Sequence, residues 1–166
     1  MKARKIIGVF IIILSAVMMT IVQLNAQPKE QLAEKLRPCI LQASKVKTDA
    51  QTLMGLADER HAEKFVPQQV SDLQKKMEDL KIVHDAFLNI LDDSRKKLYG
   101  DTIARLNDMY DSMNTHMLDL KQLVKKPQLD RNAIFAHAQS IQKTAGEWQM
   151  EYRGIAQALG IKLERS

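Results

Sequence analysis

The sequence predicts an all-α protein, in which an up-down-up-down antiparallel four-helix bundle follows an N-terminal signal or anchor segment. After the first 26 positions, apolar residues recur at intervals of three and four, which is the period of amphipathic helices and not of strands. Stop signals at Gly100, Pro127 and Gly160 divide this part of the chain into segments of similar length. Because the loops between these segments are short, successive helices are expected to run antiparallel, and residues 38–160 are enough for one core.

Residues 1–26 have the pattern of an export signal. A basic start, MKARK, precedes an apolar run from Ile6 to Leu24, and LNA-Q offers a cleavage point after Ala26. The apolar run is close to the roughly 20 residues that span a bilayer, and Leu24 is a poor residue three positions before the cut. A cleaved signal peptide and an uncleaved anchor are therefore both open.

The charges of the leader indicate where the rest of the chain is located. Lys2, Arg4 and Lys5 keep the N-terminus inside and direct the chain across the membrane. We expect a periplasmic or secreted protein, which touches the inner membrane only if residues 6–24 are retained as a tether. The leader holds three of the 25 basic residues and none of the 20 acidic ones, so the mature chain has 22 against 20 and a net charge of +2. This near balance argues against nucleic-acid binding.

The first two predicted helices follow the leader. Residues 27–37 are expected to form a connecting segment or extra helical turns that Pro38 kinks, before a helix from Pro38 to about His61. The second helix starts near Pro67, a favourable residue in a first helical turn. The expected core positions of these helices are Ala43, Val46, Ala50, Leu53, Met54 and Ala57, then Val70, Leu73, Met77, Leu80, Phe87, Leu88 and Leu91.

The last two helices have clearer boundaries. Tyr99-Gly100-Asp101 is expected to stop one helix and cap the next, and Asp130 caps the final helix, which ends at Gly160 before the tail 161–166. The expected core positions are Ile103, Leu106, Met113, Met117, Leu120 and Val124, then Ile134, Ala138, Ile141, Ala145, Trp148, Tyr152, Ile155 and Leu159.

Cys39 is the only cysteine, so a disulfide within the chain and a C-x-x-C-H haem attachment are both excluded. It falls on the apolar stripe of its helix, and we expect a buried, unreactive thiol. In an oxidising compartment the alternative is a bridge to another molecule.

Three methionines lie at intervals of four in the third helix, with a histidine beside the last. Met109, Met113 and Met117 fall on the same arc as other core residues, and packing is the expected role, because methionine commonly fills gaps in helical cores. The alternative is a soft-metal site for Cu(I), in which Met113 and Met117 act with His116. Otherwise we expect His116 to be solvated at the flank of this arc.

His84 lies near the centre of the second helix's apolar face. We expect a neutral core histidine that is hydrogen-bonded to a tyrosine hydroxyl. The alternative is a haem b ligand, with Met109 at about the same depth on the antiparallel third helix. His61 and His137 are also expected to face inward, at the opposite end of the bundle.

Two stretches carry a resemblance to a known family. The run MEDLKIVHDAFLNILDDSRKK, residues 77–97, and the closing EWQMEYR, residues 147–153, resemble helices of the small periplasmic b-type cytochromes. Members of that family hold haem non-covalently through one methionine and one histidine. The resemblance implies an exported four-helix bundle with haem b, although Gln149 stands where the ligand histidine would fall.

Patterns of catalytic residues are missing from the sequence: there is no Gly-rich phosphate loop, no nucleophile–histidine–carboxylate spacing and no Glu-x-x-His pair. We therefore expect a non-catalytic exported bundle with a binding or structural role in the periplasm or cell envelope; the alternative is a haem b or soft-metal protein in electron transfer or metal handling.

A partner surface is the remaining functional expectation. Leu41, Ile90, Leu118 and Phe135 fall away from the predicted core, and Leu118 and Phe135 lie on neighbouring helices. These two side chains are expected to border one docking groove for an envelope protein, a small ligand or a second copy of the chain.

Overall fold

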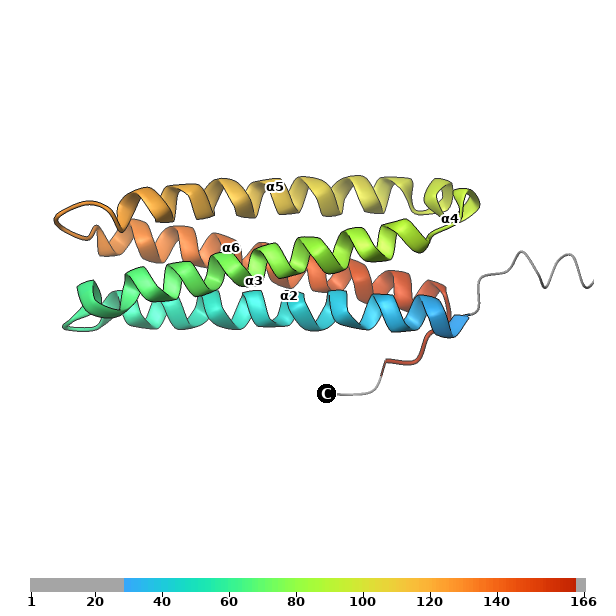
Figure 1. Ribbon diagram of the computed structural model, residues 1–166, viewed down its shortest axis with the longest axis horizontal. Helices are drawn as coiled ribbons and strands as arrows, with labels where there is room; N and C mark the ends of the chain where they lie inside the picture. The colour runs from blue at the N-terminus through green and yellow to red at the C-terminus, as the bar shows by residue number, and fades with distance from the viewer. Residues whose placement is uncertain (1–28, 164–166) are drawn as a thin grey trace, which may run out of the picture.

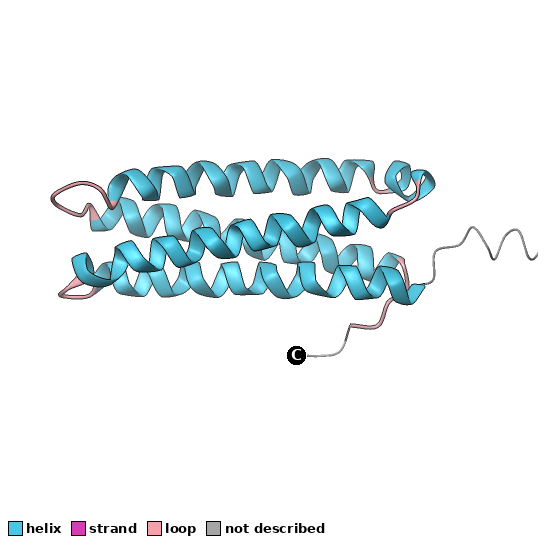
Figure 2. Ribbon diagram, viewed as in Figure 1, coloured by secondary structure: helices cyan, strands magenta, loops and turns pink. Residues whose placement is uncertain are grey.

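The computed structural model of the chain describes residues 29–163 and confirms the all-α class for this part of the protein (Figure 2). No strand occurs between these limits. The helices, in chain order, are α2 (Lys29–Asp58), α3 (Ala62–Ile90), α4 (Asp93–Leu98), α5 (Gly100–Leu123) and α6 (Arg131–Ala158). The expected signal or anchor lies outside the described residues, and none of the described helices is long and apolar enough to cross a membrane.

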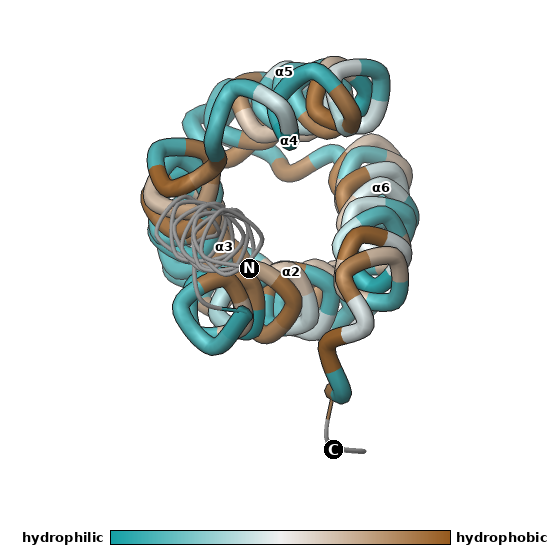
Figure 3. The backbone as a smooth tube through the Cα atoms, turned by 90° about the vertical axis from the view of Figure 1, so that its right-hand side faces the viewer, coloured by the Kyte–Doolittle hydropathy of each residue, from teal (hydrophilic) through white to brown (hydrophobic). Residues whose placement is uncertain are grey.

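The four long helices lie side by side along the long axis of the molecule, and the short α4 lies at one end, between α3 and α5 (Figure 1). Helix α2 packs along both α6 and α3, and α5 packs along α6, whereas the contact between α3 and α5 is smaller. Figure 3 looks along the helices and shows them arranged around a common interior. The interface between α5 and α6 is the one that positions the candidate site.

Helix α2 starts earlier than Pro38, so residues 29–37 are helical turns and not an irregular connection. A proline inside a helix removes one backbone hydrogen bond and costs about 3 kcal/mol. The turns before Pro38 persist because they bury Leu32 and Leu36 completely against the core. Packing of the apolar face therefore outweighs the unfavourable proline.

Helix α3 also begins before its expected start. Its first residue is Ala62, which places Pro67 beyond the first turn. Ala62 and Val66 are fully buried, and their packing extends the helix toward its N-terminus. Here again tertiary contacts move a boundary that the proline signal would place later.

The short helix α4 was not predicted. Asp92 caps it by accepting a hydrogen bond from the backbone N–H of Arg95 at 2.8 Å, and the same carboxylate pairs with the Arg95 guanidinium at 2.7 Å. One helix stops and the next begins at Tyr99-Gly100-Asp101, as predicted, but Tyr99 is the cap of both helices and Gly100 is the first residue of α5.

Both ends of α6 are as predicted. Asp130 caps its start by accepting from the Ala133 N–H at 3.0 Å. After its last turn, Gly160 takes the left-handed conformation with φ of +62°, which glycine adopts without a steric penalty. The Ile161 N–H then donates to the Ala156 carbonyl at 2.8 Å, which completes a Schellman motif.

The interior is built from the apolar faces that the sequence predicts. Phe87, Trp148 and Tyr152 are the largest fully buried side chains, and they gather near the end of α3 and the end of α6. Nearly all expected core positions are buried. Those that are only partly buried are Met54, Leu88, Ile103, Val124 and Leu159.

Candidate metal-binding site

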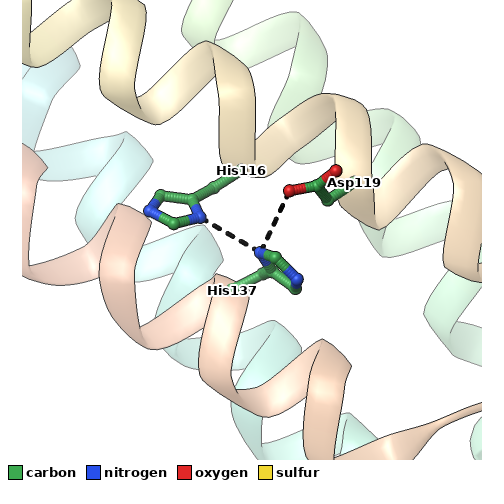
Figure 4. A group of neighbouring side chains, drawn as sticks. All are labelled: His116, Asp119 and His137. Atoms are coloured by element: carbon green, nitrogen blue, oxygen red, sulfur yellow. Dashed lines mark hydrogen bonds and ion pairs between the residues drawn. The ribbon is translucent and has the colours of Figure 1, made fainter.

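Two histidines face each other across the interface between α5 and α6. The Nδ1 atoms of His116 on α5 and His137 on α6 lie 3.0 Å apart, and the ring centroids are separated by 5.3 Å (Figure 4). At this distance one imidazole donates its N–H and the other accepts, so the hydrogen-bonded pair needs at least one neutral ring. His116 is half-buried, and the His137 side chain is 26% exposed.

A carboxylate completes the cluster from the same side. Asp119 follows His116 by three residues, and side chains at this spacing share a helix face. Its Oδ2 atom lies 3.7 Å from His137 Nδ1, and its side chain is 53% exposed (Figure 4). The ligand atoms of the three residues all lie within 4.8 Å of one another.

These separations suit a small transition-metal ion. Zinc–nitrogen distances of about 2.0–2.1 Å place two nitrogen ligands of a tetrahedral ion roughly 3.3 Å apart. The His116–His137 separation of 3.0 Å and the His137–Asp119 separation of 3.7 Å bracket that value. An ion would take the place of the hydrogen that the two imidazoles share, and the exposed Asp119 side chain would complete the ligand set from within 4.8 Å.

The donor set selects the class of metal. Two imidazole nitrogens and one carboxylate oxygen suit Zn²⁺, Cu²⁺, Ni²⁺ or Co²⁺, whereas Cu(I) prefers thiolate and thioether sulfur. Met113 and Met117 are packed in the core, while His116 lies on the partly exposed flank of α5. The structure therefore does not bring these three residues together as a thioether site. It confirms that the two methionines are packed in the core.

His84 occupies the other polar site of the bundle, and its placement is as predicted. It is fully buried, its Nδ1 atom accepts from the Tyr152 hydroxyl, and its Nε2–H donates to the Asn107 Oδ1 atom at 3.1 Å. A single neutral tautomer satisfies both bonds. Burial lowers the pKa of His84, and this effect outweighs the hydrogen bond to Asn107, which raises it.

A haem iron needs a histidine nitrogen that is free to bind it, and both nitrogens of His84 are engaged by protein groups. Met109 follows Asn107 by two residues, so it points about 200° away from the residue that reaches His84. It lines an open groove together with Lys47 and Met150. The structure does not bring His84 and Met109 together, and these residues do not fit haem b.

The buried polar network continues to Cys39, which is fully buried as predicted. The sulfur atom lies 3.2 Å from the carbonyl oxygen of Val83 and 3.3 Å from that of Lys35, and its single S–H can donate to either. The thiol also interacts with the Tyr152 hydroxyl. Burial raises the pKa of Cys39 to about 12 and also raises the pKa of Tyr152. The thiol is protonated at neutral pH and has no thiolate character for metal binding or exchange.

The other expected positions differ from the prediction in part. His61 is the exposed N-cap of α3, where it pairs with Glu63 at 3.6 Å, so the expectation that it faces inward is wrong. Leu41 is exposed as expected, whereas Ile90 is partly buried against the core.

Leu118 and Phe135 lie on opposite flanks of the α5–α6 pair. Leu118 is 52% exposed and lines a small groove with residues of α3. Phe135 is half-buried and lies two residues before His137, so it points about 200° around α6 from the side chain that meets α5. The structure does not bring the two proposed partner residues together in one groove.

Comparison of the chain with protein-family models, with curated protein sequences and with solved structures gives no match in any of the three.

Proposed function

We propose that this protein is an exported, non-catalytic four-helix bundle that binds a divalent transition-metal ion through His116, Asp119 and His137. The single observation that carries the proposal is the convergence of two imidazoles and one carboxylate on the outer side of one helix pair, with all three ligand atoms within 4.8 Å. A surface that only needed to be solvated would gain nothing from two imidazoles at hydrogen-bond distance, because each could bond water instead.

The bundle that supports this site has up-down-up-down topology. In support, the connection from α2 to α3 is only residues 59–61, and residues 124–130 join α5 to α6. Short connections of this kind link antiparallel neighbours. The colour gradient of Figure 1 is also consistent with alternating directions along the four long helices.

Export places this binding site in the periplasm or cell envelope. This part of the proposal is supported by the sequence of residues 1–26, in which a basic start precedes an apolar run. Zinc and copper ions in that compartment can reach this site from solvent, because its side chains are partly exposed. Its imidazole ligands suit both metals.

Metal stoichiometry tests the proposal. Mature protein is stripped with a chelator and dialysed against Zn²⁺ or Cu²⁺, and bound metal is measured for the parent and for His116→Gln and His137→Gln. We expect one ion per chain in the parent and none in either variant. His61→Gln is the matched control, because it removes an exposed histidine outside the cluster.

Loss of binding in His61→Gln as well would show non-specific coordination by surface histidines. A parent protein that binds no ion would refute the metal-binding function.

A further inference from the structure

The three ligands of the candidate site leave one side of the ion open. Within residues 29–163, the cluster contains His116, Asp119 and His137 and no fourth histidine, cysteine or carboxylate. A structural zinc site is closed by four protein ligands, whereas a site with three protein ligands holds water in the fourth position. The 53% exposure of the Asp119 side chain places this fourth position toward solvent.

Neighbouring positions on the two helices do not close the site. On α6, the residue one turn after His137 that faces outward is Ser140, and its hydroxyl donates to the Ala136 carbonyl at 3.0 Å. On α5, the residue one turn before His116 is Ser112, which is exposed and whose neutral hydroxyl is a poor ligand for Zn²⁺ or Cu²⁺. Solvent is thus the fourth ligand that remains.

We infer that the bound ion accepts an imidazole nitrogen from outside the chain at this fourth position, so that the protein and the external imidazole hold the metal together in one mixed complex. The inference rests on the proposed metal-binding function. In the exchange, the bond between the metal and a water molecule breaks, a metal–nitrogen bond forms, and the water leaves to solvent. No oxidant and no proton transfer are needed when the incoming imidazole is neutral.

The imidazole donor is favoured by the chemistry of the site. Borderline divalent ions that already hold two imidazoles also bind a third, as in sites with three histidines and one open position. The donor is either a small imidazole compound or the histidine side chain of another protein, because the open side lies on the outer surface of α5 and α6.

Cobalt-substituted protein provides the test, because Co²⁺ accepts the same ligands as zinc and its visible ligand-field bands report a change of ligand. We expect added imidazole to shift these bands saturably, while equilibrium dialysis shows that one Co²⁺ per chain is retained. A helical peptide with one exposed histidine forms the second arm: a response to imidazole alone assigns a small-molecule donor, and a response to both assigns a site that a protein donor also reaches.

A designed fourth ligand closes the site. Ser112→His adds an imidazole four residues before His116, on the same face of α5. We expect this variant to keep its Co²⁺ and to lose the response to imidazole. Asn114→His is the matched control: it adds the same side chain to α5 on the flank that lines a groove with α3, and it should respond as the parent does.

Three results would overturn the inference. If Co²⁺ is bound and imidazole leaves its bands unchanged, the fourth position is closed. If imidazole removes the metal from the protein, no mixed complex forms. Failure to bind Co²⁺, Zn²⁺ and Cu²⁺ at all refutes the proposed function itself and the inference with it, and is distinguished from the first two results by the metal content.

Discussion

The Nδ1 atoms of His116 and His137 lie 3.0 Å apart although 21 positions separate the two residues in the chain. The pair joins α5 to α6 close to the loop between them, and Asp119 adds a carboxylate one turn nearer to that loop. An ion held by these residues would crosslink two helices that pack along each other. Binding would therefore favour the folded state over the unfolded chain.

Zinc should raise the thermal stability of the protein through this crosslink. At a free Zn²⁺ concentration of 100 times Kd, the stabilisation is about 2.7 kcal/mol, which corresponds to a rise in Tm of roughly 10 °C for a domain of this size. Differential scanning calorimetry of the stripped and loaded protein measures the shift. His137→Gln should abolish it, and an equal shift in that variant would place the ion elsewhere.

Replacing Met113 by leucine should cost less than roughly 1.5 kcal/mol of unfolding free energy, because the exchange nearly conserves volume in the core. Urea denaturation measures the change. Leu106→Ala is the control for sensitivity, since loss of a fully buried leucine side chain costs about 2–5 kcal/mol. If added Cu(I) stabilised the parent and not Met113→Leu, packing would not be the whole role of this methionine.

Removing the Tyr152 hydroxyl should leave the His84 Nδ1 atom without its donor in the core. We expect Tyr152→Phe to lose about 1–3 kcal/mol of stability, which is the usual cost of a buried polar group without a partner. The matched control is Tyr99→Phe, since Tyr99 is only partly buried and lies at the end of α4. Equal losses in the two variants would show that the buried hydrogen bond adds nothing.

Acid should destabilise the fold through His84. Its pKa is lowered in the folded state, so below about pH 6.5 the unfolded chain binds a proton that the buried imidazole does not. The stability is complete above pH 6.5 and falls as the pH drops toward the folded-state pKa, by at most about 1.4 kcal/mol per pH unit.

Nuclear magnetic resonance titration of the His84 ring checks the sign of this effect. The ring signals should stay those of a neutral imidazole through pH 6.5 while the protein remains folded. Free titration of His84 at pH 6.5 would contradict the burial and the two hydrogen bonds that the structure gives it.

The position of His84 follows from the sequence because it depends only on the phase of one helix. Three-and-four spacing places His84 between Leu80 and Phe87 on the apolar stripe of α3, and the structure buries all three. A tyrosine on an apolar stripe of another helix was therefore an available partner. The burial of His84 and its need for a buried partner can therefore be predicted without knowing the order of the helices around the core.

The pairing of His116 with His137 could not be predicted in this way. Each residue lies on the flank of its helix, and which neighbour a flank meets depends on the direction in which the helices succeed one another around the core. One signal was available: His116 lies seven residues before the end of α5 at Leu123, and His137 lies six residues after the start of α6 at Arg131. These nearly equal distances from one loop place them at about the same depth. Depth alone does not show whether the two flanks face each other.

The same uncertainty about flanks separates Leu118 from Phe135, and glutamate substitutions distinguish their surroundings. Leu118 is 52% exposed on the α3 side of α5, so Leu118→Glu should change the stability by no more than about 0.5 kcal/mol. Phe135 is half-buried on the flank of α6 that faces away from His116 on α5, and Phe135→Glu should cost about 1–3 kcal/mol, because a charge replaces partly buried apolar surface.

Thermal unfolding and sedimentation of the two single variants test this difference together with self-association. If a second copy of the chain docks on the Leu118 groove, the parent should dimerise and Leu118→Glu should be monomeric with an unchanged thermal transition. Phe135→Glu should retain the dimer at temperatures where it is folded, since it lies on the other flank of the helix pair. Equal losses of stability would mean that both side chains are packed alike, which contradicts the difference between the exposed Leu118 and the half-buried Phe135.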